Sequence, residues 1–210
     1  MLGFYNPSVI LTYLSLISAG VGFSFLARGG QEGFFAALIC LMISGICDMF
    51  DGAVAARCKR NEEEKLFGVE IDALCDLVAF GALPAQMVIF LGKNSVLSIV
   101  AAVAILLSSV IRLGFFNVQE MTRDRGEKRE YYLGLPVTMI SICFPLLLLC
   151  DLLLGIKTTL WAPLSILLLA VLEISPFKLK KPYGIGKIVV LVIGVSVGVG
   201  VILCRAKIGA

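Results

Sequence analysis

The sequence predicts an all-α integral membrane protein whose helices cross the bilayer several times. Of its 210 residues, 59% are hydrophobic and only 16% are charged, whereas soluble domains contain about 45–50% apolar and about 25% charged residues. The apolar residues also form long runs, separated by charged residues or by Gly and Pro. Because a helix needs about 20 apolar residues to cross the hydrocarbon core, both observations favour a bundle of spanning helices.

Seven apolar runs are long enough to be spanning helices. In chain order, we expect them near residues 8–27, 33–56, 67–92, 95–117, 133–153, 158–175 and 185–204. The first run has neither the basic start nor the small-residue cleavage site of a signal peptide, so it is read as a retained helix. The short connections leave no room for a soluble domain, and we expect one membrane domain over residues 1–210 without a nucleic-acid partner.

The segments between the later runs are charged or broken by proline. The fourth run is followed by RDRGEKRE (123–130), which we expect to be a solvated loop that faces anionic lipid headgroups. Asp151 ends the fifth run and Glu173 the sixth, and both acids are expected at the membrane interface. The sixth run is followed by PFKLKKPYGIGK, expected to be a basic surface loop. In the seventh run, Gly194 and Gly198 form a GxxxG pattern that favours close packing against another helix or a second copy of the chain.

The basic residues predict an orientation in the membrane. Most of the 18 Lys and Arg residues lie in or beside the loops that follow the second, fourth and sixth runs. Cytoplasmic loops are enriched in Lys and Arg. These three loops and the N-terminus are therefore expected on the cytoplasmic side.

Four aspartates around the second loop are the candidate site. Asp48 and Asp51 end the second run, and Asp72 and Asp76 begin the third. At 100° per residue, the first pair is separated by about 60° around its helix and the second pair by about 40°. Each pair therefore forms one acidic stripe, and the two stripes can converge. Glu70 lies about 200° from Asp72 and is expected to point away.

An acidic site of this kind requires cations. The sequence has no histidine, so the usual zinc ligand and general base are absent. An all-carboxylate site suits Mg²⁺, Mn²⁺ or Ca²⁺, and four carboxylates can serve two ions together with phosphates. The alternative is that these acids pair with nearby Arg57, Lys59 and Arg60, which explains one aspartate at a helix end better than four with paired spacing.

The order of these residues resembles the signature of the CDP-alcohol phosphotransferase family, D-x2-D-G-x2-A-R-x8-G-x3-D-x3-D. The matching positions, within residues 48–76, are Asp48, Asp51, Gly52, Ala55, Gly68, Asp72 and Asp76. Arg57 stands one position later than the signature arginine, and ten residues rather than eight separate it from Gly68. The resemblance implies six core transmembrane helices, plus one or two further helices in this chain, a homodimer, and a metal site that opens to the cytoplasm of a bacterial or archaeal cell.

The resemblance also implies roles for individual residues. Asp48, Asp51, Asp72 and Asp76 would hold two divalent cations, Mg²⁺ or Mn²⁺, with Asp76 also the catalytic base that accepts the proton of the acceptor hydroxyl. The residues implied for CDP binding are Asp51, Gly52, Ala55, Arg57, Gly68 and Asp72. The glycines at the two ends of the loop would let a nucleotide approach the backbone.

Three further stretches are similar to bacterial and archaeal phosphatidylserine synthases: FGVEIDALCDLVAFGALPA (67–85), RLGFFNV (112–118) and YYLGLPV (131–137). They imply transfer of a phosphatidyl group from CDP-diacylglycerol to L-serine with release of CMP. Arg112 and Asn117 are the candidate acceptor-binding residues, since arginine can bind the serine carboxylate with two hydrogen bonds. Membrane lipids would surround the helices.

Two alternatives stay open. The same family uses other alcohols, such as inositol phosphate or glycerol phosphate, and these should require further cationic residues near the site; Phe115 stands where an arginine could have stood. A divalent-cation transporter would also contain buried aspartates. A transport site, however, is expected nearer the membrane midplane than acids clustered at one face.

Overall fold

The computed structural model describes residues 3–122, 131–154, 158–180 and 185–204, and within them the predicted all-α class is confirmed. A short 3₁₀ turn, Pro7–Val9, leads into the first helix. The elements that follow are α1 (Ile10–Arg28), α2 (Gly30–Ala55), α3 (Glu62–Asp76), a π-helical segment (Leu77–Ala82), α4 (Leu83–Leu91), α5 (Val96–Met121), β1 (Tyr131–Leu133), a 3₁₀ turn (Val137–Met139), α6 (Ile140–Leu154), α7 (Thr158–Ile174), β2 (Lys178–Lys180) and α8 (Ile185–Cys204).

The membrane-spanning character of the helices agrees with the sequence. Four helical stretches are long and apolar enough to cross a bilayer: Pro7–Arg28, Gly30–Ala55, Glu62–Leu91 and Val96–Met121. Three shorter apolar helices follow, at Val137–Cys150, Thr158–Ile174 and Ile188–Leu203. When α3, the π-helical segment and α4 are counted as one helix, the described residues form six helices up to α7, followed by one further helix, α8.

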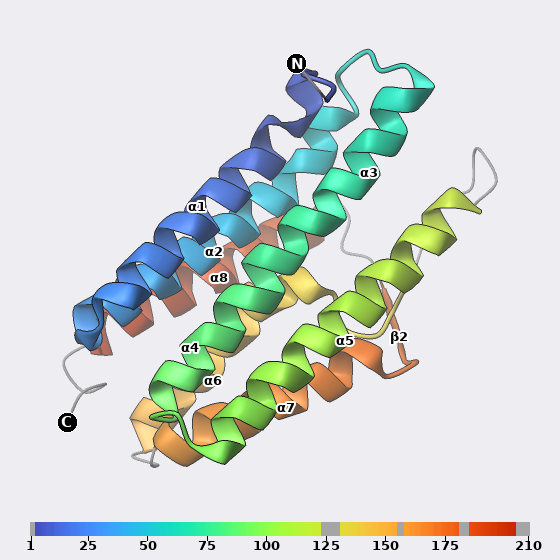
Figure 1. Ribbon diagram of the computed structural model, residues 1–210. Helices are drawn as coiled ribbons and strands as arrows, with labels where there is room; N and C mark the ends of the chain where they lie inside the picture. Colours follow the sequence, from blue (N-terminus) through green and yellow to red (C-terminus); the bar gives the residue numbers. More distant parts are fainter. Residues whose placement is uncertain (1–2, 123–130, 155–157, 181–184, 205–210) are drawn as a thin grey trace.

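The helices form an elongated bundle (Figure 1). Helix α1 packs along α2, and α5 packs against α4 and α7, while α6 contacts α7 and α8. Large side chains such as Phe34, Phe80 and Phe144 are fully buried between them. Many other large apolar side chains are exposed along the outer faces of the helices, which is the arrangement expected of a bundle whose solvent is lipid.

Helix α3 begins earlier than the apolar run indicated. We expected a span from residue 67, whereas the helix starts at Glu62. Asn61 accepts a hydrogen bond from the backbone N–H of Glu64, and the Glu64 side chain accepts one from the backbone N–H of Asn61. This capping box, with three glutamates in the first turn, stabilises the helix N-terminus in a polar segment that hydropathy does not identify.

A π-helical segment joins α3 to α4 directly after Asp76. Figure 1 shows α3 and α4 as one continuous helix, and residues 77–82 form its π-helical part. Pro84, in the first turn of α4, has no N–H to donate to the carbonyl of residue 80, which favours a local change of helical register. Segments of this type are frequent at functional sites, and this one adjoins the aspartate cluster.

The fifth apolar run was expected to be helical from residue 133, and this boundary is wrong. Residues 131–133 form β1, which pairs antiparallel with β2, Tyr132 opposite Leu179. Gly134 has φ of +71°, a conformation that suits glycine, and Pro136 precedes the turn that leads into α6. The segment expected to be a simple basic loop after α7 therefore contributes a strand to a small β ribbon.

Helix α8 packs against its own chain through glycine. A Cβ added at Gly198 would lie 2.9 Å from Met42 Cε of α2, and one added at Gly194 would lie 3.6 Å from Ile142 of α6. The GxxxG pattern thus packs helices within the chain. This contact places α8 beside α2 and α6 (Figure 1).

Candidate functional site

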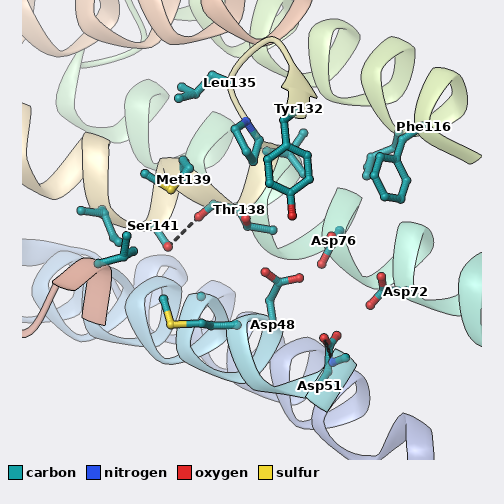
Figure 2. A pocket seen from close by; sticks show the side chains of 18 of the residues that line it. Asp48, Asp51, Asp72, Asp76, Phe116, Tyr132, Leu135, Thr138, Met139 and Ser141 are labelled. Carbon is teal, nitrogen blue, oxygen red and sulfur yellow. Dashed lines mark hydrogen bonds between the residues drawn. The ribbon is translucent and has the colours of Figure 1, made fainter. Parts of the chain in front are cut away.

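A cavity of about 690 Å³ opens between the helices at the level of the aspartates. Its walls come from α2, α3, α5, the β ribbon, the start of α6 and the first half of α8. Side chains from these elements point into a common space in Figure 2. The cavity is polar near the aspartates and apolar toward Met42, Ile142 and Val190, so one space joins an acidic site to a lipid-like environment.

All four predicted aspartates line this cavity. Asp48, Asp72 and Asp76 each offer a carboxylate oxygen, and these three oxygens lie within 4.8 Å of one another. Asp76 is the most enclosed of them, with 7% of its surface exposed. The carboxyl groups of Asp51 and Asp72 interact directly, and Figure 2 shows Asp51 beside the other three.

The helix geometry explains why these side chains meet. Asp48 and Asp51 lie one turn apart near the C-terminal end of α2, and Asp72 and Asp76 lie one turn apart near the end of α3. The two stripes therefore face each other across the cavity, as their spacing predicted. Glu70 is exposed and is not among the residues that line the cavity, which agrees with its exclusion.

The donor set suits a hard divalent cation. The described residues that line the cavity include five carboxylates (Asp48, Asp51, Asp72, Asp76 and Glu120) and two cationic side chains (Arg112 and Lys180). Carboxylate oxygens are preferred ligands of Mg²⁺, Mn²⁺ and Ca²⁺. Arg57 and Lys59 are exposed and do not line the cavity, so the cluster is not explained by pairing with these two cations.

The residues predicted to bind the nucleotide are only partly brought together. Asp51, Gly52 and Asp72 line the cavity, and the Asp51 carboxylate accepts a hydrogen bond from the Gly52 N–H. The other three predicted residues, Ala55, Arg57 and Gly68, are not part of the lining. Helix α2 ends at Ala55, so Arg57 stands in the turn beyond the helix.

Another arginine lies next to Gly68. A Cβ added at Gly68 would be 3.5 Å from Arg60 Nη1, which puts the Arg60 guanidinium beside the second signature glycine. Sequence spacing could not indicate this contact, because the path of the loop between α2 and α3 decides which of its cations turns back toward α3.

The two predicted acceptor residues line the cavity on α5. Arg112 and Asn117 are both half-buried. Sequence reasoning missed Tyr132, which the β ribbon brings over the cavity; Figure 2 shows its hydroxyl group pointing toward the aspartates. Lys180 of β2 lines the same cavity. Both residues reach it only because β1 and β2 pair, and no local pattern in the sequence indicates that pairing.

Glu173, expected at the membrane interface, has a side chain that is buried between helices. Its side chain is 2% exposed, and it accepts hydrogen bonds from two serines of α5. The residue ends an apolar run, but the contact between α5 and α7 covers it. The other acid expected there, Asp151, has a side chain outside the described part of the chain.

Comparison with protein families defines the class of protein. The family model of CDP-alcohol phosphatidyltransferases matches residues 5–174, and the chain belongs to this family. The match contains the four aspartates, the β1 strand and α7, and it ends before β2 and α8. The chain is therefore an integral membrane protein, as its apolar helices indicated.

Three curated relatives are similar to part of this chain. The chain is 30% identical over 129 residues to the CDP-diacylglycerol–serine O-phosphatidyltransferase of Saccharomyces cerevisiae. It is 28% identical over 130 residues to the archaetidylserine synthase of Methanothermobacter thermautotrophicus, and 29% identical over 151 residues to the CDP-diacylglycerol–serine O-phosphatidyltransferase of Helicobacter pylori strain J99. These alignments cover 51%, 61% and 70% of this chain, but only 46%, 54% and 60% of the relatives.

Proposed function

We propose that the protein transfers a phosphatidyl group from CDP-diacylglycerol to the hydroxyl of L-serine and releases CMP. The observation that supports this most strongly is the single cavity that joins the aspartate cluster, Arg112 and an apolar arm. These three parts match the pyrophosphate, the amino-acid acceptor and the lipid portion of the two substrates. The names of the relatives favour the same acceptor.

We infer that two divalent cations, Mg²⁺ or Mn²⁺, bind the aspartates. Asp48, Asp72 and Asp76 can share one ion, and Asp51, adjacent to Asp72, extends the carboxylate set for a second. When bound, such ions would neutralise negative charge on the pyrophosphate and on the departing CMP. The protein's own contribution is to hold four carboxylates on two rigid helices in a partly enclosed space.

In the proposed reaction, the serine oxygen forms a bond to the phosphorus that carries the diacylglycerol. The bond between this phosphorus and the bridging oxygen breaks, and CMP leaves with that oxygen. The serine hydroxyl is a poor nucleophile until a base takes its proton. Asp76 is our candidate for this base because it is the most enclosed aspartate of the cluster and the chain has no histidine.

The charge of the acceptor side favours serine over phosphorylated alcohols. Among the described lining residues only Arg112 and Lys180 are cationic, and Phe115 is exposed and not part of this lining. Arg112 can bind the serine carboxylate through its planar fork, with Asn117 one and a half turns further along α5. A phosphate group would add two negative charges to an already acidic cavity.

Replacing Arg112 by lysine tests this acceptor assignment. Arg112→Lys keeps the positive charge but loses the bidentate geometry, so we expect the KM for serine to rise about tenfold or more, a loss equivalent to one charge-assisted hydrogen bond. The KM for CDP-diacylglycerol should change by less than about twofold. An unchanged requirement for serine, measured as CMP release, would rule out this role for Arg112.

The two alternative functions are separated by the choice of substrate. Purified protein in CDP-diacylglycerol micelles would be given serine, glycerol phosphate or inositol phosphate, and CMP release would be measured for each. We expect serine to be used in preference to both phosphates. CMP release with a phosphorylated acceptor but not with serine would move the chain to the other branch of the family, whereas cation flux into vesicles without CMP release would support a transporter.

We further propose that the aspartate site faces the cytoplasm, as the distribution of Lys and Arg favours. We also propose that the chain forms a homodimer, as the family resemblance implies.

Cys58 tests the orientation because it lies in the loop between α2 and α3, is partly exposed and is a free thiol. A membrane-impermeant thiol reagent should label Cys58 in inverted vesicles and not in intact cells. Cys58→Ser should remove this label, and labelling of Cys58 in intact cells would reverse the orientation.

A further inference from the structure

A buried carboxylate lies behind the acceptor side of the cavity. Glu173, near the C-terminal end of α7, is 2% exposed. Its Oε2 accepts hydrogen bonds from Ser108 Oγ at 2.8 Å and from Ser109 Oγ at 3.1 Å. Both serines are themselves buried. Burial of an ionised carboxylate is energetically unfavourable unless it is hydrogen-bonded and near a positive charge. Glu173 therefore requires a cationic side chain nearby.

That positive charge belongs to Arg112. Ser108, Ser109 and Arg112 lie within about one turn of α5, with Arg112 about 40° from Ser108 and about 60° from Ser109 around the helix. The Arg112 charge lies within electrostatic range of both the Glu173 and the Asp76 carboxylates. Arg112 lines the cavity, whereas Glu173 is not among the lining residues. Arg112 is thus under the influence of a carboxylate behind the cavity wall as well as of the aspartate cluster.

The backbone around Glu173 is held to the β ribbon. Leu135 N–H donates to the Leu172 carbonyl at 3.0 Å, and Gly134 N–H donates to the Phe177 carbonyl at 2.8 Å. A Cβ at Gly134 would overlap the Glu173 carbonyl oxygen. Only glycine therefore permits this close approach of the ribbon to α7. These contacts fix the end of α7 relative to the ribbon that carries Tyr132 into the cavity. The backbone position of Glu173 is therefore well defined relative to the cavity.

We propose that Glu173 is a positioning residue that holds the Arg112 guanidinium in place to receive the carboxylate of the acceptor. Without Glu173, the long arginine side chain would regain rotamer freedom, and the aspartates would draw it toward the cation site. The guanidinium carries five N–H donors in a planar fork, so one edge can face Glu173 while another faces the substrate. This inference rests on the proposed function, because it assigns Arg112 to the serine carboxylate.

The test is the isosteric variant Glu173→Gln, whose amide oxygen can still accept from the two serines. We expect the KM for serine to rise about tenfold, with less than about a twofold change in the KM for CDP-diacylglycerol. If Glu173 acts through Arg112, Glu173→Gln combined with Arg112→Lys should be no worse than Arg112→Lys alone. Effects that multiply in the double variant, or an equal rise in both KM values, would contradict the proposal.

Matched variants separate positioning from general damage. Glu70→Gln removes an exposed acid outside the cavity and should leave both KM values unchanged, while Glu173→Asp keeps the charge and should restore part of the serine affinity. If Glu173→Gln does not fold, as judged by its elution as a single species and its thermal melting, Ser108→Ala with Ser109→Ala provides the second test. This pair leaves the carboxylate unanchored and should also raise the KM for serine selectively; an unchanged KM would contradict the proposal.

The outcomes also distinguish this proposal from the proposed function. A wild-type protein that releases no CMP with serine would contradict the proposed function, and the assignment of Glu173 would fail with it. A serine-dependent wild type whose Glu173→Gln variant has an unchanged KM for serine would contradict the role of Glu173 alone.

Discussion

Replacing Asp48 or Asp72 by asparagine is expected to reduce CMP release by about 100-fold or more, since loss of residues that only support metal ligands already costs about 10–100-fold. Each substitution removes one negative charge and one of the three clustered carboxylates. Binding of divalent cations and of CDP-diacylglycerol should weaken together, because the proposed cations hold the pyrophosphate. Both can be measured by titration calorimetry on the detergent-solubilised protein.

The control for this pair is Glu63→Gln, which removes an exposed carboxylate from the first turn of α3. It should leave cation binding and turnover unchanged. Helical content, measured by circular dichroism, should be the same in all variants, because the aspartates lie on the cavity wall and do not cap the helices. Wild-type turnover in Asp48→Asn or Asp72→Asn would remove the metal-site assignment.

Replacing Asp76 by asparagine should have a different signature. If Asp76 accepts the serine proton, Asp76→Asn should lower turnover by about 10²–10⁴-fold, the usual contribution of a general base. Affinity for CDP-diacylglycerol should fall no further than in Asp48→Asn or Asp72→Asn, because the amide oxygen can still bind a cation, whereas it cannot accept the proton, so the additional loss should appear in turnover alone. Single-turnover CMP release at saturating CDP-diacylglycerol would separate this chemical defect from a binding defect.

The comparison with Asp72→Asn makes the Asp76 experiment decisive. Both residues lie on α3, one turn apart, and both belong to the same carboxylate cluster. A pure metal ligand should lose lipid binding and turnover in parallel. Parallel loss in Asp76→Asn as well would assign Asp76 to metal binding alone and leave the proton acceptor unidentified.

The aspartate cluster could be predicted from the sequence because its geometry is mostly local. Helical periodicity alone places Asp48 with Asp51 and Asp72 with Asp76, and the loop between α2 and α3 is too short to send the second helix elsewhere. The start of α3 could also have been found, since Asn61 and Glu64 have the spacing of a capping box. Hydropathy misses that signal because capping occurs in a polar segment.

The other walls of the cavity depend on contacts that no local pattern encodes. Tyr132 and Lys180 reach the site only because β1 pairs with β2, and these strands are 45 residues or more apart in the chain. Glu173 is buried because α5 supplies two serines, whereas in the sequence it is only an acid at the end of an apolar run. Pairing of this kind is set by tertiary packing, so the acceptor side was less predictable than the metal side.

The most direct test of the account is to follow both products of one reaction. Purified protein would be incubated with CDP-diacylglycerol and isotopically labelled serine, and CMP and labelled phosphatidylserine would be quantified together by mass spectrometry. We expect equal amounts of the two products, no product after chelation of divalent cations, and recovery on addition of Mg²⁺ or Mn²⁺. CMP release without labelled lipid, or product formation that persists after chelation, would contradict metal-dependent phosphatidyl transfer to serine.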